Sequence, residues 1–319
     1  MGLAVSSQIF IDGQEGTTGL QIYSRLNSRN DIELIQIESK FRKNKDHRAR
    51  CYEQADLIIL CLPDAASEAA VQDLLRPESR ILDASSAFRT HPDWTYGLPE
   101  LGPHQSKLIS NSSHVSNPGC YATGYILLIR PLIAAGLIGK EICLSVQGIS
   151  GYSGGGRKCI EQWQGSDQPT QAYGLDLKHK HLPEMRMYSG CQSTPLFSPF
   201  IANYAAGMIT QVPVSHNTCS SEFSAESVYQ CWQQHFKDAP FIKVHPPKSD
   251  AELCEGKLSP CARNNSNYLD LFVFGHKTQS VLMARYDNLG KGASGAAVQN
   301  MNLMLGLGEM TGLENAHAL

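Results

Sequence analysis

The chain has 319 residues, which is enough for two domains of ordinary size. Hydrophobic residues make up 42% and charged residues 18%, a globular composition that excludes an intrinsically disordered chain. The formal net charge of −3 comes without any block of basic residues, so nucleic acid is not expected as a partner.

Targeting and membrane signals are weak in this sequence. The longest apolar runs, such as residues 57–62 and 125–129, fall far short of the roughly 20 residues that span a bilayer. The first seven residues carry no charged region, so no secretory signal is expected. The ten cysteines are scattered, with no CxxC pair and no zinc spacing with histidine, which predicts reduced thiols, no metal and a cytoplasmic location.

The first third of the chain alternates strands with helices. Four short apolar or alternating runs are predicted as strands: residues 8–12, 32–38, 57–62 and 80–84. Apolar residues at helical spacing predict helices at 17–29 and 65–75. This order indicates an α/β fold with a parallel sheet between layers of helices.

From about residue 146 the pattern changes. A glycine-rich loop at 148–156 precedes short strand-like runs at 200–203, 209–214 and 268–274. These runs predict a second, α+β domain on a mixed or antiparallel sheet. The last periodic segment, residues 293–307, returns to helical spacing.

A glycine-rich turn follows the first predicted strand. Gly13, Gly16 and Gly19 form a GxxGxxG pattern, and Thr17 and Thr18 open the next helix. Glycines at such a turn let the backbone approach a pyrophosphate at the helix N-terminus. A nucleotide-free α/β protein can carry the same turn, but the strand–turn–helix context favours a dinucleotide cofactor and a Rossmann-type domain.

The end of the second predicted strand bears on the cofactor. Glu38 stands where an acidic residue binds the ribose 2′-hydroxyl of NAD. Ser39, Lys40, Arg42 and Lys43 follow, and they suit the 2′-phosphate of NADP, although a solvated basic loop has the same composition. These residues leave the choice between NAD and NADP open.

Cys120 is the candidate nucleophile. The segment SNPGCYATG at 116–124 places it after a proline and a glycine and before a predicted helix at 121–132. A helix N-terminus favours the thiolate, which is the form that attacks carbon. An isolated cysteine is usually a small buried hydrophobe, but this turn beyond a dinucleotide-binding half favours catalysis.

His179 and His181, in the run HKHLPE at 179–184, are the candidate proton carriers. A thiolate nucleophile needs a neighbouring imidazole, because histidine titrates near neutral pH. Both side chains project to one side of an extended segment, so either can reach a shared site. The alternatives are one surface and one core histidine, or a metal pair, which lacks a third ligand at a supporting spacing.

Taken in order, these motifs resemble the N-acetyl-gamma-glutamyl-phosphate reductase family, in its shorter form, within the semialdehyde dehydrogenase superfamily. The glycine loop, LDASSAFR (82–89), YGLPEL (96–101), SNPGCY (116–121), HKHLPE (179–184) and GKGASG (290–295) carry the resemblance. Proline and glycine before the cysteine suit this family better than aspartate-semialdehyde dehydrogenase, whose cysteine follows an asparagine.

The resemblance implies a reaction in arginine biosynthesis. Cys120 would attack the acyl phosphate of N-acetyl-L-glutamyl 5-phosphate and expel phosphate. The thioester would take a hydride from NADPH and yield N-acetyl-L-glutamate 5-semialdehyde. His179 or His181 would serve as acid and base, with His179 preferred, and Glu184 would orient the imidazole.

The resemblance also implies the substrate contacts. Arg89 and Arg157 are candidates for the phosphate and carboxylate, because a guanidinium binds such groups bidentately. Ser150 is a further candidate substrate contact. An ordinary surface arginine is the alternative for both arginines.

A second cofactor loop is implied near the C-terminus: Gly290, Lys291, Gly292 and Asn300. The last helix then returns to the nucleotide domain. Residues 1–117 with 286–319 would form the NADP-binding domain, and residues 118–285 the catalytic, substrate-binding and oligomerisation domain. The resemblance thus favours NADP(H) and a homo-oligomer, a dimer or a tetramer.

Two alternative functions remain at this point. An aspartate-semialdehyde dehydrogenase-like enzyme would share the cysteine and the cofactor fold. A non-catalytic dinucleotide-sensing protein would keep the fold without needing a nucleophile and an imidazole, so Cys120 and the histidines count against it.

Overall fold

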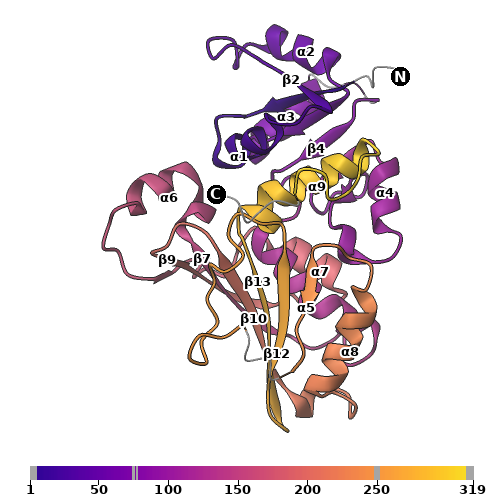
Figure 1. The fold of residues 1–319 in the computed structure, drawn as a ribbon, viewed down its shortest axis with the longest axis vertical. Helices are drawn as coiled ribbons and strands as arrows, with labels where there is room; N and C mark the ends of the chain where they lie inside the picture. Colours follow the sequence, from indigo (N-terminus) through magenta and orange to yellow (C-terminus); the bar gives the residue numbers. More distant parts are fainter. Residues whose placement is uncertain (1–5, 74–75, 77, 248–251, 314–319) are drawn as a thin grey trace. The chain divides into compact units, whose positions relative to one another are not determined.

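The computed structural model describes residues 6–73, 76, 78–247 and 252–313, which fall into two compact units (Figure 1). The first unit takes the described residues of Met1–Pro99, His104–Pro118 and Ala293–Asn315. The second takes Glu100–Pro103 and the described residues of Gly119–Gly292. The chain therefore leaves the first unit for the second and returns for its last helix.

The first unit is built on a six-stranded parallel sheet in the order β2-β1-β3-β4-β6-β5. Its strands are β1 (Ser7–Asp12), β2 (Ile32–Ile35), β3 (Leu57–Leu60), β4 (Ile81–Asp83), β5 (Thr95–Tyr96) and β6 (His114–Ser116). The order reverses between β1 and β3, and ligands of such sheets bind beyond the carboxyl ends of the strands at this point.

Helices flank this sheet. They are α1 (Thr17–Leu26), α2 (Lys45–Gln54), α3 (Asp64–Asp73), α4 (Gln105–Asn111) and α9 (Gly295–Met304). The α1 helix buries Gly19, Ile22 and Leu26 on one face, as its helical spacing predicts. From the far end of the chain, α9 packs against α1, α4 and β4 (Figure 1).

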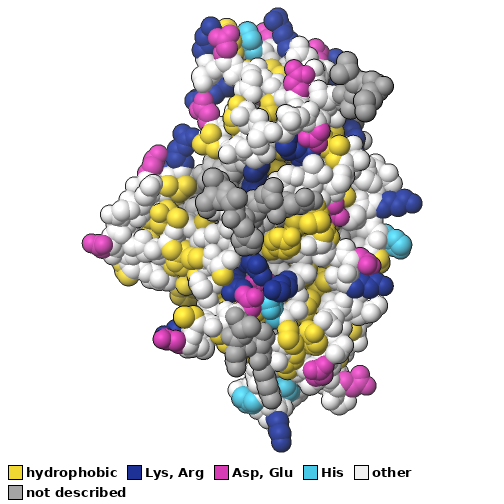
Figure 2. All heavy atoms as spheres, viewed as in Figure 1, with side chains coloured by type: hydrophobic (Ala, Val, Ile, Leu, Met, Phe, Trp, Pro, Cys, Tyr) yellow, Lys and Arg dark blue, Asp and Glu magenta, His cyan; other side chains and the backbone are white. Residues whose placement is uncertain are grey.

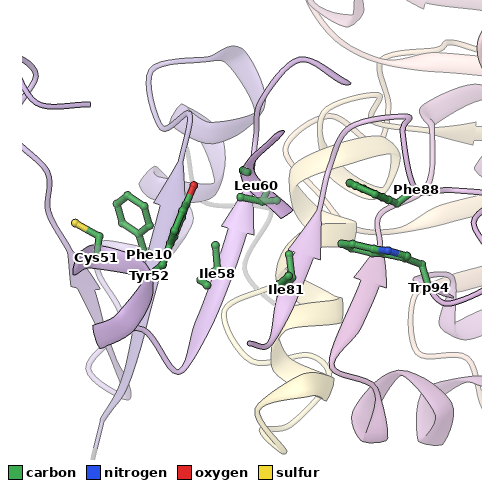
Figure 3. Packing of buried hydrophobic residues seen from close by; sticks show 9 residues of the cluster. Phe10, Cys51, Tyr52, Ile58, Leu60, Ile81, Phe88 and Trp94 are labelled. Carbon is green, nitrogen blue, oxygen red and sulfur yellow. The ribbon is translucent and has the colours of Figure 1, made fainter. Parts of the chain in front are cut away.

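A hydrophobic cluster on the first sheet is shown in Figure 3. Ile58 and Leu60 of β3 project into it, and Phe10 meets Tyr52 edge-on with ring centroids 5.5 Å apart. The whole of β3 is buried, as expected for a central parallel strand. This packing fixes the strand ends that carry the glycine loop.

The second unit has a seven-stranded mixed sheet in the order β11-β12-β13-β10-β7-β9-β8. Its strands are β7 (Ser145–Gly151), β8 (Gln171–Ala172), β9 (Leu196–Ala202), β10 (Met208–Ser215), β11 (Ile242–Val244), β12 (Leu269–Gly275) and β13 (Gln279–Tyr286). The pairs β7–β9 and β11–β12 are parallel, and the others are antiparallel. A Rossmann-type α/β domain with a second, mixed sheet is thus confirmed.

The helices of the second unit are α5 (Cys120–Ala134), α6 (Gly156–Trp163), α7 (Leu182–Ser189) and α8 (Ala225–His235), with short 3₁₀ turns at η1 (Pro99–Leu101), η2 (Tyr152–Gly155) and η3 (His216–Thr218). The α5 helix is buried on nearly all sides, because α7, α8, β10 and β13 pack around it. No helix in the described ranges is both long and apolar enough to span a membrane.

Candidate active site

A cleft of about 490 Å³ lies in the first unit, beyond the carboxyl ends of β1 and β3. The glycine loop forms one wall, and Ser39, Arg42 and Lys43 contribute to another. Lys40 instead pairs with Glu38, with Nζ 2.8 Å from the carboxylate. The predicted dinucleotide loop and part of the predicted basic run therefore border one cavity.

The backbone of the glycine loop requires its glycines. Gly13 has a φ of +85°, and a side chain there would meet the carbonyl oxygen of Cys61. A side chain at Gly19 would meet the carbonyl oxygen of Gly13, which accepts the N–H of Gly16 at 2.9 Å. Among the described residues no side chain caps α1, whose first turn holds Thr17 and Thr18, so its N–H groups suit an anion.

Glu15 reaches the basic wall of the cleft. Its carboxylate pairs with the Arg42 guanidinium and accepts a hydrogen bond of 3.1 Å from the Ser39 hydroxyl. Ser39 and Arg42 therefore converge on one anionic group in this conformation. The Ser39 hydroxyl and the Arg42 guanidinium can therefore donate hydrogen bonds to the same anionic group.

Asn300 and Arg89 are buried in the first unit. The Asn300 Nδ2 donates to the carbonyl of Gly97 at 2.8 Å and to the Asn117 side chain at 3.1 Å. Its Oδ1 is buried and accepts no hydrogen bond from the residues that the structure describes. Arg89 Nε donates to the Asn117 carbonyl at 3.0 Å, and Nη2 lies 3.5 Å from the Ala84 carbonyl.

The other residues of the predicted second cofactor loop open the π-helical turn η4 (Gly290–Ser294). Lys291 is fully buried in the second unit, where Nζ donates to Glu100 at 2.6 Å. A Cβ on Gly292 would come within 2.9 Å of the Cys120 Cβ, so this glycine packs directly against Cys120.

Cys120 is the first residue of α5 and is partly buried. The preceding N–H, of Gly119, donates to the buried carboxylate of Glu184 at 3.1 Å. The Cys120 carbonyl accepts the Tyr286 hydroxyl at 2.7 Å. The main chain around the thiol is thus held on both sides by side chains from other elements.

The two histidines lie beside the same helical turn. Their ring centroids are 4.6 Å apart, and each lies about 6 Å from the ring of Tyr121, at 5.9 Å for His179 and 6.0 Å for His181. His181 is buried at the N-cap position of α7 and has helical backbone angles, so the segment turns and does not run extended as expected. The turn still brings both imidazoles next to the residue that follows Cys120.

A backbone hydrogen bond selects the tautomer of His179. The His181 N–H donates to His179 Nδ1 at 3.1 Å. An Nδ1 atom that accepts a hydrogen bond carries no proton, so the neutral ring holds its proton on Nε2. His179 therefore presents Nε2 as a hydrogen-bond donor.

Two residues from the glycine-rich segment occupy different settings. Ser150, in β7, is buried, and its hydroxyl donates to the Gly151 carbonyl at 3.1 Å. Arg157 is exposed in the first turn of α6. The described residues contain no group of three or more His, Cys, Asp or Glu side chains arranged to hold a metal ion.

Three further polar residues of the second unit lie around the first turn of α5 and were not predicted from the sequence: Tyr121, Thr210 and Tyr286. Burial raises the pKa of the Tyr121 and Tyr286 phenols well above the ordinary value, so both remain protonated hydrogen-bond donors. Tyr121 stands beside Cys120 in the sequence, but Thr210 and Tyr286 lie in strands whose sequences give no local signal of a site.

Known protein families match both halves of the chain. Residues 37–109 match the semialdehyde dehydrogenase NAD binding domain, and residues 120–288 match the semialdehyde dehydrogenase dimerisation domain. An N-acetyl-gamma-glutamyl-phosphate reductase 2 of a Nostoc species is 45% identical, over 96% of this chain and 99% of its own. An N-acetyl-gamma-glutamyl-phosphate reductase of Burkholderia cenocepacia is 43% identical, over 93% and 97%.

Solved structures share the fold at low sequence identity. Aspartate semialdehyde dehydrogenase II of Vibrio cholerae has a TM-score of 0.71 at 16% identity, covering 94% of this chain and 98% of its own. Aspartate semialdehyde dehydrogenase of Candida albicans, solved with NADP, has a TM-score of 0.67 at 12% identity, with the same coverage. By fold, motifs and sequence identity, the chain belongs to the N-acetyl-gamma-glutamyl-phosphate reductase family of semialdehyde dehydrogenases.

Proposed function

We propose that the protein reduces N-acetyl-L-glutamyl 5-phosphate to N-acetyl-L-glutamate 5-semialdehyde and phosphate with NADPH, as a step of arginine biosynthesis. The observation that carries the chemistry is Cys120 at the start of α5, with two imidazoles beside the same turn. The substrate comes from the names of relatives at 43–45% identity.

Cys120 acts as the nucleophile in this proposal. Its thiolate sulfur attacks the acyl carbon, a carbon–sulfur bond forms, and the carbon–oxygen bond to phosphate breaks. The first turn of α5 carries no acidic residue, and the N–H dipoles at a helix start stabilise a thiolate. The buried Glu184 carboxylate fixes the turn through the Gly119 N–H.

His179 handles the proton at the carbonyl oxygen. Its Nε2 proton, fixed by the hydrogen bond at Nδ1, suits donation to oxygen as negative charge develops there. His181 is proposed to contact substrate or to share the acid–base role. The tetrahedral oxyanion held by the hydrogen bond from His179 then expels the Cys120 thiolate, so that the carbon–sulfur bond breaks and the aldehyde is released.

The first-unit cleft fits a nicotinamide dinucleotide, which supplies the hydride when bound. Gly13, Gly16, Thr17, Thr18 and Gly19 would hold the diphosphate at the start of α1. The buried, unsatisfied Oδ1 of Asn300 is an acceptor suited to a carboxamide N–H. Gly290, Lys291 and Gly292 remain the proposed second loop.

NADP is the proposed form of the cofactor. Ser39 and Arg42 converge on the Glu15 carboxylate, and Lys43 lines the same cleft, so this wall offers cationic donors to a 2′-phosphate. Lys40 belongs to the same exposed loop and adds positive charge. Glu38, the acidic candidate for the ribose of NAD, pairs with Lys40 and is not among the residues that line the cleft.

The substrate contacts are also proposals. Arg157, exposed at the start of α6, suits the carboxylate of the acetylated amino acid. Arg89 is proposed for the phosphate, and its guanidinium is anchored by the Asn117 carbonyl. Ser150 would support the glycine-rich segment near the substrate.

We also propose a homo-oligomer, a dimer or a tetramer, in the cytoplasm with reduced cysteines. On the second sheet, Ile149, Ile209, Pro213, Val281 and Met283 are partly or fully exposed and alternate with buried residues. In Figure 2, hydrophobic side chains also gather around α6, β7 and β9. A second copy would cover such an apolar sheet face, and the matched family domain is described as a dimerisation domain.

The decisive assay uses the reverse reaction on purified protein. N-acetyl-L-glutamate 5-semialdehyde with phosphate and NADP should give NADPH at a kcat/KM far above that for aspartate semialdehyde. A preference for aspartate semialdehyde would support the related enzyme class. Tight NADP binding without turnover of either aldehyde would support a dinucleotide sensor.

A further inference from the structure

Tyr286, at the end of β13, reaches the first turn of the helix that carries the nucleophile. The residue is completely buried. Its hydroxyl donates to the Cys120 carbonyl at 2.7 Å and accepts the Gly124 N–H at 3.2 Å. One oxygen atom therefore joins both ends of the first α5 turn to the sheet.

The Tyr286 hydroxyl uses all of its hydrogen-bonding capacity. Because its single proton goes to the Cys120 carbonyl, the Thr210 hydroxyl 3.0 Å away must donate to it. A phenol oxygen accepts at most two hydrogen bonds, and Thr210 and Gly124 supply both. Burial raises the pKa of Tyr286, so the donated proton stays in place across the physiological range.

Gly124 makes room for this contact. A Cβ at position 124 would come within 2.5 Å of the Tyr286 hydroxyl and within 2.9 Å of the Thr210 hydroxyl. Glycine is unfavourable inside a helix, so its presence in α5 needs a packing reason. The approach of the Tyr286 hydroxyl to the helix backbone supplies that reason.

The contact bears on the direction of the thiol. Glu184 holds the N–H of Gly119, Tyr286 holds the carbonyl of Cys120, and Gly292 packs against the Cys120 Cβ. We propose that Tyr286 is a positioning residue for Cys120, which keeps the first turn of α5 and hence the sulfur aligned for attack. This inference rests on the proposed acyl-transfer function.

The test compares Tyr286→Phe with Tyr125→Phe. Both remove one buried phenol oxygen, but Tyr125 lies within α5 and its hydroxyl contacts the Cys191 sulfur at 3.6 Å instead of Cys120. Tyr286→Phe should lower kcat about 10- to 100-fold, the scale expected for a misplaced reacting group, with KM and NADP affinity within about twofold. Tyr125→Phe should keep kcat within about twofold of the parent.

A second readout needs no turnover. The rate of iodoacetamide labelling at Cys120, followed by peptide mass spectrometry, should change severalfold in Tyr286→Phe and not in Tyr125→Phe. Gly124→Ala, which displaces the hydroxyl, should behave like Tyr286→Phe. Parent-like kcat and labelling in Tyr286→Phe, or equal losses in both tyrosine variants, would overturn the proposal. If the parent turns over no acyl substrate, the proposed function fails, and the labelling comparison still decides the role of Tyr286.

Discussion

At the scale of single residues, the histidine pair is the sharpest question. His179 presents Nε2 as a donor, whereas His181 is buried at the start of α7. We expect His179→Asn to lower kcat about 10²–10⁴-fold and to remove one limb of the pH–rate profile. His181→Asn should give a smaller loss, weighted towards KM.

Steady-state kinetics of both variants across pH tests this assignment. The reversed pattern would exchange the two roles. Near-normal kinetics and pH dependence in both single variants would remove the segment from the active site.

Cofactor choice is a second prediction at this scale. Arg42 lines the cleft, while Lys40 pairs with Glu38 on the exposed loop. Arg42→Gln should lower the ratio of kcat/KM for NADP over NAD by about tenfold or more, because it removes a charge-assisted contact to the phosphate. Lys40→Gln should lower the ratio less. Equal kcat/KM for NADP and NAD in the parent would count against this assignment.

The candidate site residues can be recognised in the sequence because they lie in short motifs. Cys120 after Pro118 and Gly119, and the histidine pair, stand out in the sequence without the fold. Tyr286 does not, because 166 positions separate it from Cys120 and no motif surrounds it in its strand. Contacts of this kind arise only when the sheet brings distant strands to one helix.

At the scale of elements, the glycine loop gives a prediction with a matched control. Gly13 has a left-handed backbone conformation, so Gly13→Ala should lower the free energy of unfolding by about 1–2 kcal/mol through backbone strain. The new methyl group would also clash with the Cys61 carbonyl. Gly136 has a φ of +70° with open space around it, so Gly136→Ala carries the strain without the clash.

Chemical denaturation and NADP titration distinguish the two variants. Both should lose stability, with the larger loss in Gly13→Ala, and only Gly13→Ala should weaken NADP binding strongly. Similar NADP affinity in both variants would show that the loop does not hold the cofactor.

Helices and strands with a clear apolar period were predictable, and others were not. The expected helix at 17–29 ends three residues earlier, at Leu26, and the strand at 32–38 ends at Ile35. Helices α2, α4, α6, α7 and α8 were not anticipated. The α2 helix is polar on most sides and buries only Cys51 and Tyr52, so tertiary packing rather than periodicity defines it.

At the scale of the whole molecule, the fold does not determine which substrate an enzyme of this kind takes. The solved aspartate semialdehyde dehydrogenases share the fold at 12–16% identity, so the fold alone does not name the substrate. The strand order of the second sheet could not be predicted from the sequence either, because β10 pairs with β13, which lies some 70 residues further along the chain. Only the residues at the candidate site and the relatives that match over nearly the full length reduce the number of activities to consider.

Assembly can be tested at the same scale. Met283→Asp places a charge on the apolar face of the second sheet, and Leu108→Asp places one on the exposed side of α4, where Leu108 is 55% exposed. Light scattering after size-exclusion chromatography should show a lower mass for Met283→Asp only, because burying a carboxylate is costly. A parent that elutes as a monomer would contradict the proposed homo-oligomer.

The proposed role of Cys120 as the carrier of the acyl group can be tested in a single experiment. Parent protein is mixed with N-acetyl-L-glutamyl 5-phosphate in the absence of nicotinamide cofactor, quenched in acid and mapped by peptide mass spectrometry. We expect an N-acetylglutamyl thioester on the peptide that contains Cys120, and none in Cys120→Ser. An acyl group on a different cysteine, or a Cys120→Ser variant that turns over at the parent rate, would contradict it.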